Sequence, residues 1–299
     1  MTSIFKAFLE PDVDRPAFIA AFLRAREVPV TEVTLAGKRH VIVRFRAEAY
    51  DPRFRMKTFV AHHDRVPGSP GANDNSAACF QLMILACRLA ASAARHNVRI
   101  IFTDGEEAGG ITGIAGQGSF ALGNALNARG EDAGDVYVFD CTGRGDTLVL
   151  SQSGLSGIAH RALAARMSSL HERARQSART FAQGAWICLP TPYSDNAGFL
   201  ASGIPAQVVT VLPAEEATRL LASQSPLARS GATATERARS LKDAIARNKA
   251  PSSQDRGADD YPDTWKLMHT AADSSPTLTA SAFTLMRDFL DGLARSLEP

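Results

Sequence analysis

Short apolar runs alternate with longer segments of helical periodicity along most of the chain. The runs of strand length lie at 29–36, 39–46, 56–64, 98–104, 135–140, 147–151 and 205–212. Segments with apolar residues at helical spacing lie at 15–27, 76–94, 155–180 and 275–295. Strands that alternate with helices are typical of a layered α/β fold, in which helices cover a mostly buried sheet.

Histidines and carboxylates gather where three of the predicted strands end. The strands that end near residues 62, 104 and 140 each run into a cluster of His, Asp or Glu. In open α/β sheets, ligands bind at the carboxyl ends of the strands. These strand ends therefore indicate where the chemistry of the protein is to be expected.

The charge of the chain is close to balanced, with 33 Lys and Arg against 31 Asp and Glu and a net charge of +2. A dedicated nucleic-acid-binding protein would normally carry a strongly basic face, so we expect no nucleic-acid partner. No apolar stretch reaches the length of about 18 residues that a bilayer requires, and the N-terminus does not resemble a signal peptide. We therefore expect a cytoplasmic protein with no membrane partner, and the sequence leaves its oligomeric state open.

The first candidate residues lie at and after the end of the strand predicted at 56–64. His62 stands near the strand end, and Asp64, two positions later, points to the same side of an extended chain. A carboxylate beside a metal-bound histidine fixes the tautomer of the ring and raises its basicity. Asp74 stands in a turn with Gly and Asn before the next helix, where a carboxylate held by the loop can bridge two cations.

Further candidates follow the next strands and precede the last helix. Glu106 and Glu107 are adjacent, and because two buried carboxylates repel, we expect one to bind a metal while the other acts as a base. Asp140 ends an apolar strand, and His269 lies shortly before the last helix. Each residue alone is compatible with a structural role, but together they form a ligand set that zinc, cobalt or manganese accepts.

The candidate residues belong to five separated sequence blocks. In order, the blocks are HHD with PGSPGANDN at 62–75, DGEEAGG at 104–110, VFDCTG at 138–143, YSDNAGFLASGIPA at 193–206 and MHTAAD at 268–273. Together they resemble the co-catalytic di-zinc aminopeptidases of clan MH, which include bacterial leucyl aminopeptidases and, as a divergent branch, glutaminyl cyclases. The resemblance covers about residues 55–295. It implies a zinc-exopeptidase-like three-layer sandwich, whose mixed, mostly parallel central sheet has helices on both faces.

The resemblance also implies a role for each candidate. One zinc site would consist of His62, Asp74 and Asp140. The other would consist of Asp74, Glu107 and His269, with Asp74 as the bridge. Glu106 would be the general base, and Asp64 would support the ring of His62. The residues that match a family segment near the substrate pocket are Tyr193, Ser194 and Asp195.

These ligands bear on the domain organisation. A chain of 299 residues has a prior of roughly two domains of about 150 residues each. A single site with ligands from His62 to His269 is difficult to divide between two independent domains. We therefore expect one catalytic domain over 1–299, with the Ala-, Ser- and Arg-rich stretch 222–260 as a flexible or helical insertion.

Three functions stay open on the sequence alone. The leading one is a zinc-dependent aminopeptidase acting on small peptides or aminoacyl substrates, with two zinc ions per chain and cobalt or manganese as substitutes. The second is a glutaminyl cyclase-like acyltransferase, favoured by the DGEEA string and by Cys79 in the helix after Asp74, for which one zinc ion is expected. The third is a non-catalytic scaffold with a relic of the site.

Overall fold

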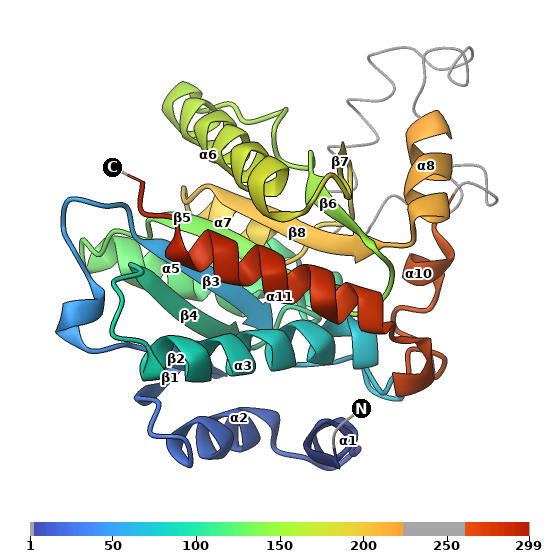
Figure 1. Ribbon diagram of the computed structural model, residues 1–299, viewed down its shortest axis with the longest axis horizontal. Helices are drawn as coiled ribbons and strands as arrows, with labels where there is room; N and C mark the ends of the chain where they lie inside the picture. The colour runs from blue at the N-terminus through green and yellow to red at the C-terminus, as the bar shows by residue number, and fades with distance from the viewer. Residues whose placement is uncertain (1–2, 224–260, 299) are drawn as a thin grey trace.

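The centre of the fold is a mixed sheet with the strand order β1-β2-β4-β3-β5-β8-β6-β7 (Figure 1). The computed structural model describes residues 3–223 and 261–298, so the insertion expected at 222–260 lies outside the described residues from position 224 onward. The strands are β1 (Val30–Leu35), β2 (Lys38–Val43), β3 (Lys57–His62), β4 (Val98–Thr103), β5 (Asp135–Phe139), β6 (Thr147–Ser151), β7 (Trp186–Leu189) and β8 (Ala206–Leu212).

The middle of the sheet is parallel, and its two sides are not. β4, β3, β5 and β8 are parallel neighbours. β2 pairs antiparallel with β4 and with β1, whereas β6 pairs antiparallel with β8 and parallel with β7. The mixed, mostly parallel sheet expected from the sequence is therefore confirmed, and the carboxyl ends of β3, β4 and β5 lie at one edge.

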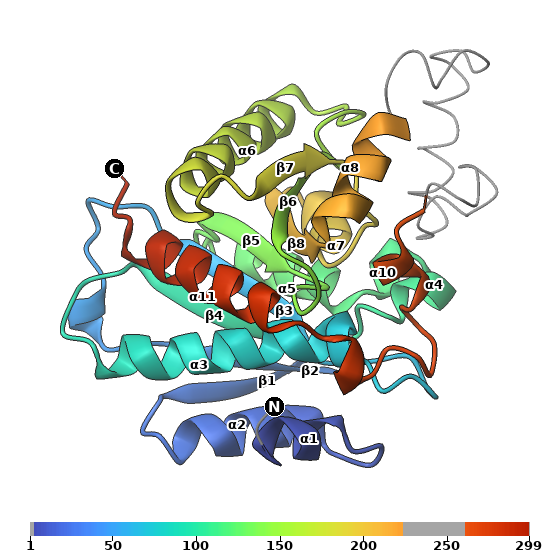
Figure 2. The ribbon, with the colours of Figure 1, turned by 45° about the vertical axis from the view of Figure 1, so that its right-hand side comes forward.

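Helices cover both faces of the sheet (Figures 1 and 2). One face packs against α1 (Ser3–Leu9), α2 (Arg15–Arg24), α3 (Ala77–Ala91), α6 (Arg161–Phe181) and α11 (Ala280–Arg295). The opposite face packs against α5 (Gly118–Ala128), α7 (Asn196–Ala201), α8 (Ala214–Ser223) and α10 (Asp263–Lys266). This arrangement confirms the predicted layers.

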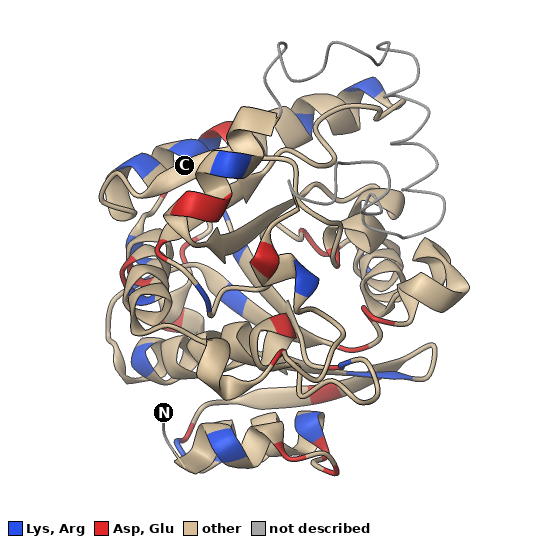
Figure 3. Cartoon of the chain, turned by 90° about the vertical axis from the view of Figure 1, so that its right-hand side faces the viewer, with Lys and Arg blue, Asp and Glu red and all other residues tan. Residues whose placement is uncertain are grey.

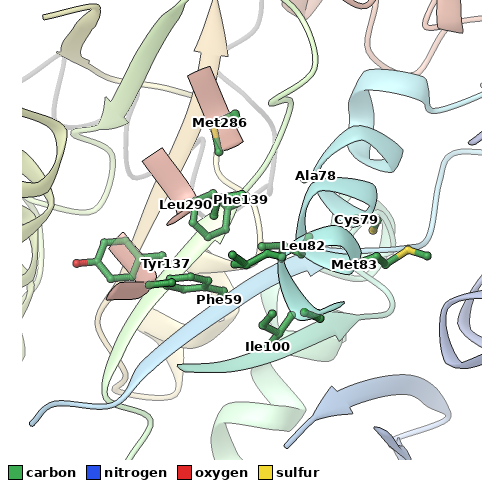
Figure 4. Packing of buried hydrophobic residues seen from close by; sticks show 14 of the residues in the cluster. Phe59, Ala78, Cys79, Leu82, Met83, Ile100, Tyr137, Phe139, Met286 and Leu290 are labelled. Atoms are coloured by element: carbon green, nitrogen blue, oxygen red, sulfur yellow. The ribbon is translucent and has the colours of Figure 1, made fainter. Parts of the chain in front are cut away.

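Alternation along the strands separates the larger core from the side on which the candidate residues lie. In β3, Phe59 packs with Tyr137 and Phe139 of β5 beneath α3 and α11 (Figure 4). The intervening Val60 belongs to the core on the opposite face. Successive side chains of a strand point to opposite faces, so His62 shares the side of Val60.

Two helices begin later in the chain than apolar periodicity predicts, and each begins next to a capping hydrogen bond. The helix expected from 155 begins at Arg161, where the ring of His160 accepts a hydrogen bond from the N–H of Leu163. The closing helix begins at Ala280 instead of 275, because Thr279 caps it. The strand β7 and the helix α5 were not predicted: β7 spans only 4 residues, and α5 contains two glycines.

Charged residues of both signs are interspersed on the side of the molecule seen in Figure 3. Ion pairs join different elements of the fold, such as Arg173 of α6 with Asp135 of β5 at 2.6 Å and Arg88 of α3 with Asp291 of α11 at 2.7 Å. Within residues 3–223 and 261–298, no helix has the length and apolar character that crossing a membrane requires.

The substitution Phe59→Ala tests the aromatic packing beneath the site. Phe59 is 0 % exposed, and its ring centroid lies 5.4 Å from that of Phe139. Large-to-small changes of a buried Phe cost about 3–5 kcal/mol, so we expect a clearly lower urea midpoint. The control Leu221→Ala, at a position that is 48 % exposed, should change the free energy of unfolding by less than about 0.5 kcal/mol. Equal midpoints for the two variants would contradict this packing.

Candidate metal centre

The carboxyl ends of β3, β4 and β5 carry most of the candidate residues to one edge of the sheet. β3 ends at His62, and Asp140 directly follows β5. Glu106 and Glu107 follow β4 after a tight turn at Gly105, whose φ of 78° favours glycine. Because the three strands are parallel neighbours, these side chains come together although they are far apart in the sequence.

His62 is surrounded by three carboxylates. Its Nδ1 atom lies 3.5 Å from Asp64 Oδ1. Its Nε2 atom lies 3.3 Å from Asp74 Oδ1 and 3.6 Å from Asp140 Oδ1. The ring is fully buried. Asp64 therefore lies on the same side as His62, as the two-residue period of an extended chain predicts.

His269 contacts the other oxygen of Asp74. Its Nε2 atom lies 3.2 Å from Asp74 Oδ2 and 3.0 Å from Glu107 Oε2. Since Oδ1 of the same carboxylate faces His62, Asp74 stands between the two histidines with one oxygen directed at each. This is the geometry of a carboxylate that can bridge two cations.

The atoms at this centre suit a metal. Within the described residues, three overlapping groups have potential ligand atoms that all lie within 4.8 Å of one another: His62, Asp74 and Asp140; His62, Glu106 and Glu107; Asp74, Glu107 and His269. Both ring nitrogens of His62, Glu107 Oε1 and Asp140 Oδ1 are buried without a hydrogen-bond partner. Buried polar atoms are normally satisfied, and nitrogen and carboxylate donors are zinc ligands, so the residues fit zinc.

Asp64 organises more of the site than its contact with His62. Its Oδ1 atom accepts a hydrogen bond from the N–H of Glu106 at 3.2 Å, and its Oδ2 atom accepts one from the N–H of Glu107 at 3.0 Å. One carboxylate thus orients the histidine of β3 and the two glutamates after β4. Asp64 thus lies beside His62, the ring that it is predicted to support, and also holds the loop after β4.

The loop that carries Asp74 is tied to the end of β5. It forms the short η2 turn (Ala72–Ser76) before α3, and the peptide bond between Asp74 and Asn75 is cis. The side-chain amide of Asn75 donates to the carbonyl oxygen of Phe139 at 2.8 Å, and Asn73 Oδ1 accepts from the N–H of Gly143 at 2.7 Å. Asp74 is thereby held beside Asp140.

Burial raises the pKa values of the two adjacent glutamates. It raises the pKa of Glu106 well above 4.5, and the charge of Glu107 adds to the shift while His62 opposes it. Burial and the charge of Asp74 raise the pKa of Glu107 to about 7, against the hydrogen bond from His269. Carboxyl groups in such an environment keep protons near neutral pH unless a cation replaces them.

The neighbouring carboxylates raise the pKa of both histidines, whereas burial lowers it. Burial alone would lower the pKa of His62, but Asp140, Asp64 and Asp74 raise it well above 6.5. Hydrogen bonds to Asp74 and Glu107 raise the pKa of His269 to about 11. In the absence of a metal, the surrounding carboxylates therefore favour the protonated form of both rings.

A cavity of about 540 Å³ opens onto this centre. Its polar wall includes Asp64, Asp74, Glu106, Glu107, Asp140 and His269. Its apolar wall includes Val66, Pro67, Ala108, Ile111, Pro192, Val208, Trp265 and Met268. Tyr193 lines the cavity as well, so one of the three predicted pocket residues lies where a substrate could contact it.

Ser194 and Asp195 are not among the residues that line the cavity. They are 1 % and 0 % exposed. Asp195 Oδ2 accepts a hydrogen bond from Thr103 Oγ1 at 2.5 Å, and burial raises the pKa of Asp195 to about 6. Direct substrate contact by this pair stays a prediction, and their surroundings are those of interior residues.

Two further residues complete the site and were not singled out from the sequence. Gln117 Nε2 donates to Glu106 Oε1 at 3.3 Å. Asp273 accepts hydrogen bonds from the N–H groups of Asn73 and Asp74. Asp273 closes the MHTAAD block, which is a signal for it in the sequence, whereas Gln117 lies in a Gly-rich segment with no comparable signal.

Solved structures with a similar fold include aminopeptidases and glutaminyl cyclases. A leucine aminopeptidase precursor from Bacteroides thetaiotaomicron is 14% identical, with a TM-score of 0.63 and coverage of 99% of this chain and 95% of that chain. A glutaminyl cyclase from the same organism is 15% identical, with a TM-score of 0.63 and coverage of 99% and 96%. BSAP, a zinc aminopeptidase from Bacillus subtilis, is 15% identical, with a TM-score of 0.52 and coverage of 87% and 50%. At these identities, the likeness shows the fold.

The family comparison is more specific than the fold. No curated protein matches the chain. The sequence model of peptidase family M28 matches residues 40–289, a range that contains all five candidate ligands and Glu106. The chain therefore belongs to peptidase family M28, as the five sequence blocks predicted.

Proposed function

We propose that the chain is a zinc-dependent aminopeptidase that hydrolyses the N-terminal peptide bond of small peptides or aminoacyl compounds. The observation that carries the proposal is the division of Asp74 between two ligand groups, with Oδ1 3.3 Å from His62 and Oδ2 3.2 Å from His269. A shared carboxylate of this kind favours two ions per chain. Membership of a peptidase family supports the reaction class.

Five side chains would hold the metal: His62, Asp74, Glu107, Asp140 and His269. When bound, zinc supplies a Lewis acid that polarises the substrate carbonyl and makes water more acidic. Cobalt and manganese accept the same nitrogen and carboxylate donors and could substitute. Asp64 fixes the His62 ring through Nδ1, which leaves the Nε2 atom directed at Asp74 and Asp140.

Glu106 is the proposed general base. It lines the cavity, and Gln117 contacts its Oε1 atom at 3.3 Å. Glu106 would accept a proton from the water that attacks the carbonyl carbon and deliver that proton to the amine as the C–N bond breaks. Burial raises the pKa of Glu106, so its ionised carboxylate would be a stronger base than that of an exposed glutamate.

The charge of the cavity favours a substrate amine over a substrate carboxylate. Among the described residues that line it, Arg65 is the single Lys or Arg. The Arg65 guanidinium already donates to the carbonyl oxygens of Leu9, Glu10, Pro11 and Pro70. A free α-ammonium group fits the acidic wall, whereas a C-terminal carboxylate has no such partner. We therefore propose exopeptidase action from the N-terminus. The cytoplasmic location expected from the sequence stays a prediction.

A glutaminyl cyclase-like reaction is the second candidate. Solved glutaminyl cyclases share the fold over nearly the whole chain, and Cys79 donates to the carbonyl oxygen of His62 at 3.1 Å. Cyclisation would release ammonia from an N-terminal glutamine, whereas hydrolysis would release the glutamine itself. The two reactions consequently give different products from one substrate.

The substitution Glu106→Gln tests the base. It keeps the size of the side chain but removes proton acceptance, so we expect kcat to fall by about 10²–10⁴-fold while the bound zinc stays unchanged. Turnover is measured on aminoacyl anilides with and without chelator, and metal content on the same samples. Glu215→Gln, at an exposed position of α8, is the control that should retain activity. Undiminished turnover of the Glu106→Gln protein would refute the mechanism, and absence of chelator-sensitive turnover in the wild type would favour a relic scaffold.

A glutaminyl dipeptide separates the two enzymatic candidates. We expect the wild type to convert glutaminyl-alanine to free glutamine and alanine, because the proposed water attacks the peptide carbonyl. Mass spectrometry of the products and an ammonia assay read the outcome directly. Pyroglutamyl-alanine with an equivalent of ammonia would instead establish the cyclase.

Proton release tests the metal centre through its histidines. The pKa of His269 is raised to about 11 in the metal-free fold, whereas that of an unfolded histidine is near 6.5. Protonation of His269 therefore adds fully to the free energy of unfolding below pH 6.5, and this contribution disappears as the pH rises through 11. Zinc must displace these protons, so its affinity should rise with pH between about 5 and 8. Calorimetry in buffers of different ionisation enthalpy should detect at least two protons released per chain at pH 7, one from each histidine. His269→Ala should release fewer protons, and a pH-independent affinity would contradict the assignment.

A further inference from the structure

Asp273 joins the loop of Asp74 to the segment of His269. Its backbone carbonyl accepts the N–H of Ala72 at 3.1 Å. Its Oδ1 atom accepts the N–H of Asn73 at 2.8 Å, and its Oδ2 atom accepts the N–H of Asp74 at 3.0 Å. The residue is 1 % exposed. Asp273 thus accepts hydrogen bonds from three consecutive N–H groups of the loop.

This connection matters because His269 has no strand to fix it. His62 and Asp140 stand at the ends of β3 and β5, whereas His269 lies in the irregular segment between α10 and α11 (Figure 2). Its side chain is 50% exposed, and its φ of 63° is left-handed. The position of the His269 ring relative to Asp74 therefore depends on contacts between the two segments.

The other hydrogen bonds of the loop that carries Asp74 connect it to the end of β5, away from His269. Asn75 and Asn73 tie the loop to Phe139 and Gly143, next to Asp140. Those contacts fix Asp74 relative to His62 and Asp140 but do not reach His269. Asp273 provides the corresponding tie on the His269 side.

We infer that Asp273 is a positioning residue that sets the geometry of the group Asp74, Glu107 and His269. The inference rests on the metal centre of the proposed function. Removal of this carboxylate should weaken metal binding at the His269 group and spare the group His62, Asp74 and Asp140, whose members keep their own supports. Asp273 binds no metal itself in this assignment: both of its carboxylate oxygens are used by backbone N–H groups.

Asp273→Asn is the sharpest test, because it keeps the shape and removes one acceptor. Its amide nitrogen, a donor, would face a backbone N–H that is also a donor. Asp273→Ser is the second variant: it retains one acceptor oxygen and leaves room for water, should the amide prevent folding. Folding of each variant is checked by circular dichroism and thermal melting.

Glu216→Gln is the matched control. Glu216 is a buried carboxylate of α8, and its Oε2 atom accepts the N–H of Thr264 in α10 at 2.8 Å. Its loss should lower stability in the same way as the loss of Asp273, but it touches no ligand-bearing residue. The control therefore separates positioning from general destabilisation.

Each chelator-treated full-length protein is titrated with Zn²⁺ alone and with Co²⁺ alone, by calorimetry and equilibrium dialysis. The wild type should bind two ions. In Asp273→Asn and Asp273→Ser, one ion should bind as in the wild type and the other about 10–100-fold more weakly. Glu216→Gln should bind both ions normally. In a His269→Ala background, Asp273→Asn should have no further effect on metal affinity.

Wild-type affinity for both ions in the Asp273 variants would overturn the inference, as would an equal loss at both sites that Glu216→Gln reproduces. A wild type that binds two ions and hydrolyses peptides, with unaffected Asp273 variants, would leave the proposed function intact and refute the positioning role alone. A wild type that binds no ion would overturn both.

Discussion

The burial of several carboxylates at one edge of the sheet is the constraint on which the rest of the structure depends. Asp64, Asp74, Glu107 and Asp140 converge around two histidines, and Glu106 lies beside them. Uncompensated buried charges of one sign repel strongly and lose hydration. The raised pKa values of Glu106, Glu107, His62 and His269 are one response to this excess. Divalent cations would be another, since they would supply positive charge among the carboxylates.

Strands and loops both contribute residues to this site, and they hold those residues in place by different means. Parallel strands deliver His62 and Asp140 to adjacent positions, because the register of β3 with β5 is fixed by ladder hydrogen bonds and by aromatic packing beneath. Loops deliver the remaining groups, and their positions require extra hydrogen bonds. Asp64 orients the turn of Glu106 and Glu107, while Asp273 and Asn75 hold the turn of Asp74 from two sides.

The sequence predicted those parts of the site that follow from period and motif. The buried runs gave β3, β4 and β5, the two-residue period gave the side of Asp64, and the blocks gave the ligand set. The interior position of Asp195 was not predictable, because it depends on a tertiary hydrogen bond from Thr103 of β4. The start of α6 depends on a single ring hydrogen bond at His160, which apolar periodicity does not register. Asp273 could be noticed in a motif, but its three backbone partners are set by tertiary contact alone.

The surroundings of the two glutamates favour Glu106 over Glu107 for the proposed role of general base. Glu107 is committed to the ligand group through its 3.0 Å contact with His269. The side chain of Glu106 makes no ion pair within the described part of the chain, and it accepts a hydrogen bond from the amide of Gln117 at 3.3 Å. A general base needs an oxygen that is free to exchange a proton, and a ligand needs one that is not. Adjacent residues with the same side chain thus acquire different chemistry from one histidine, which reaches Glu107 and leaves Glu106 open to the cavity.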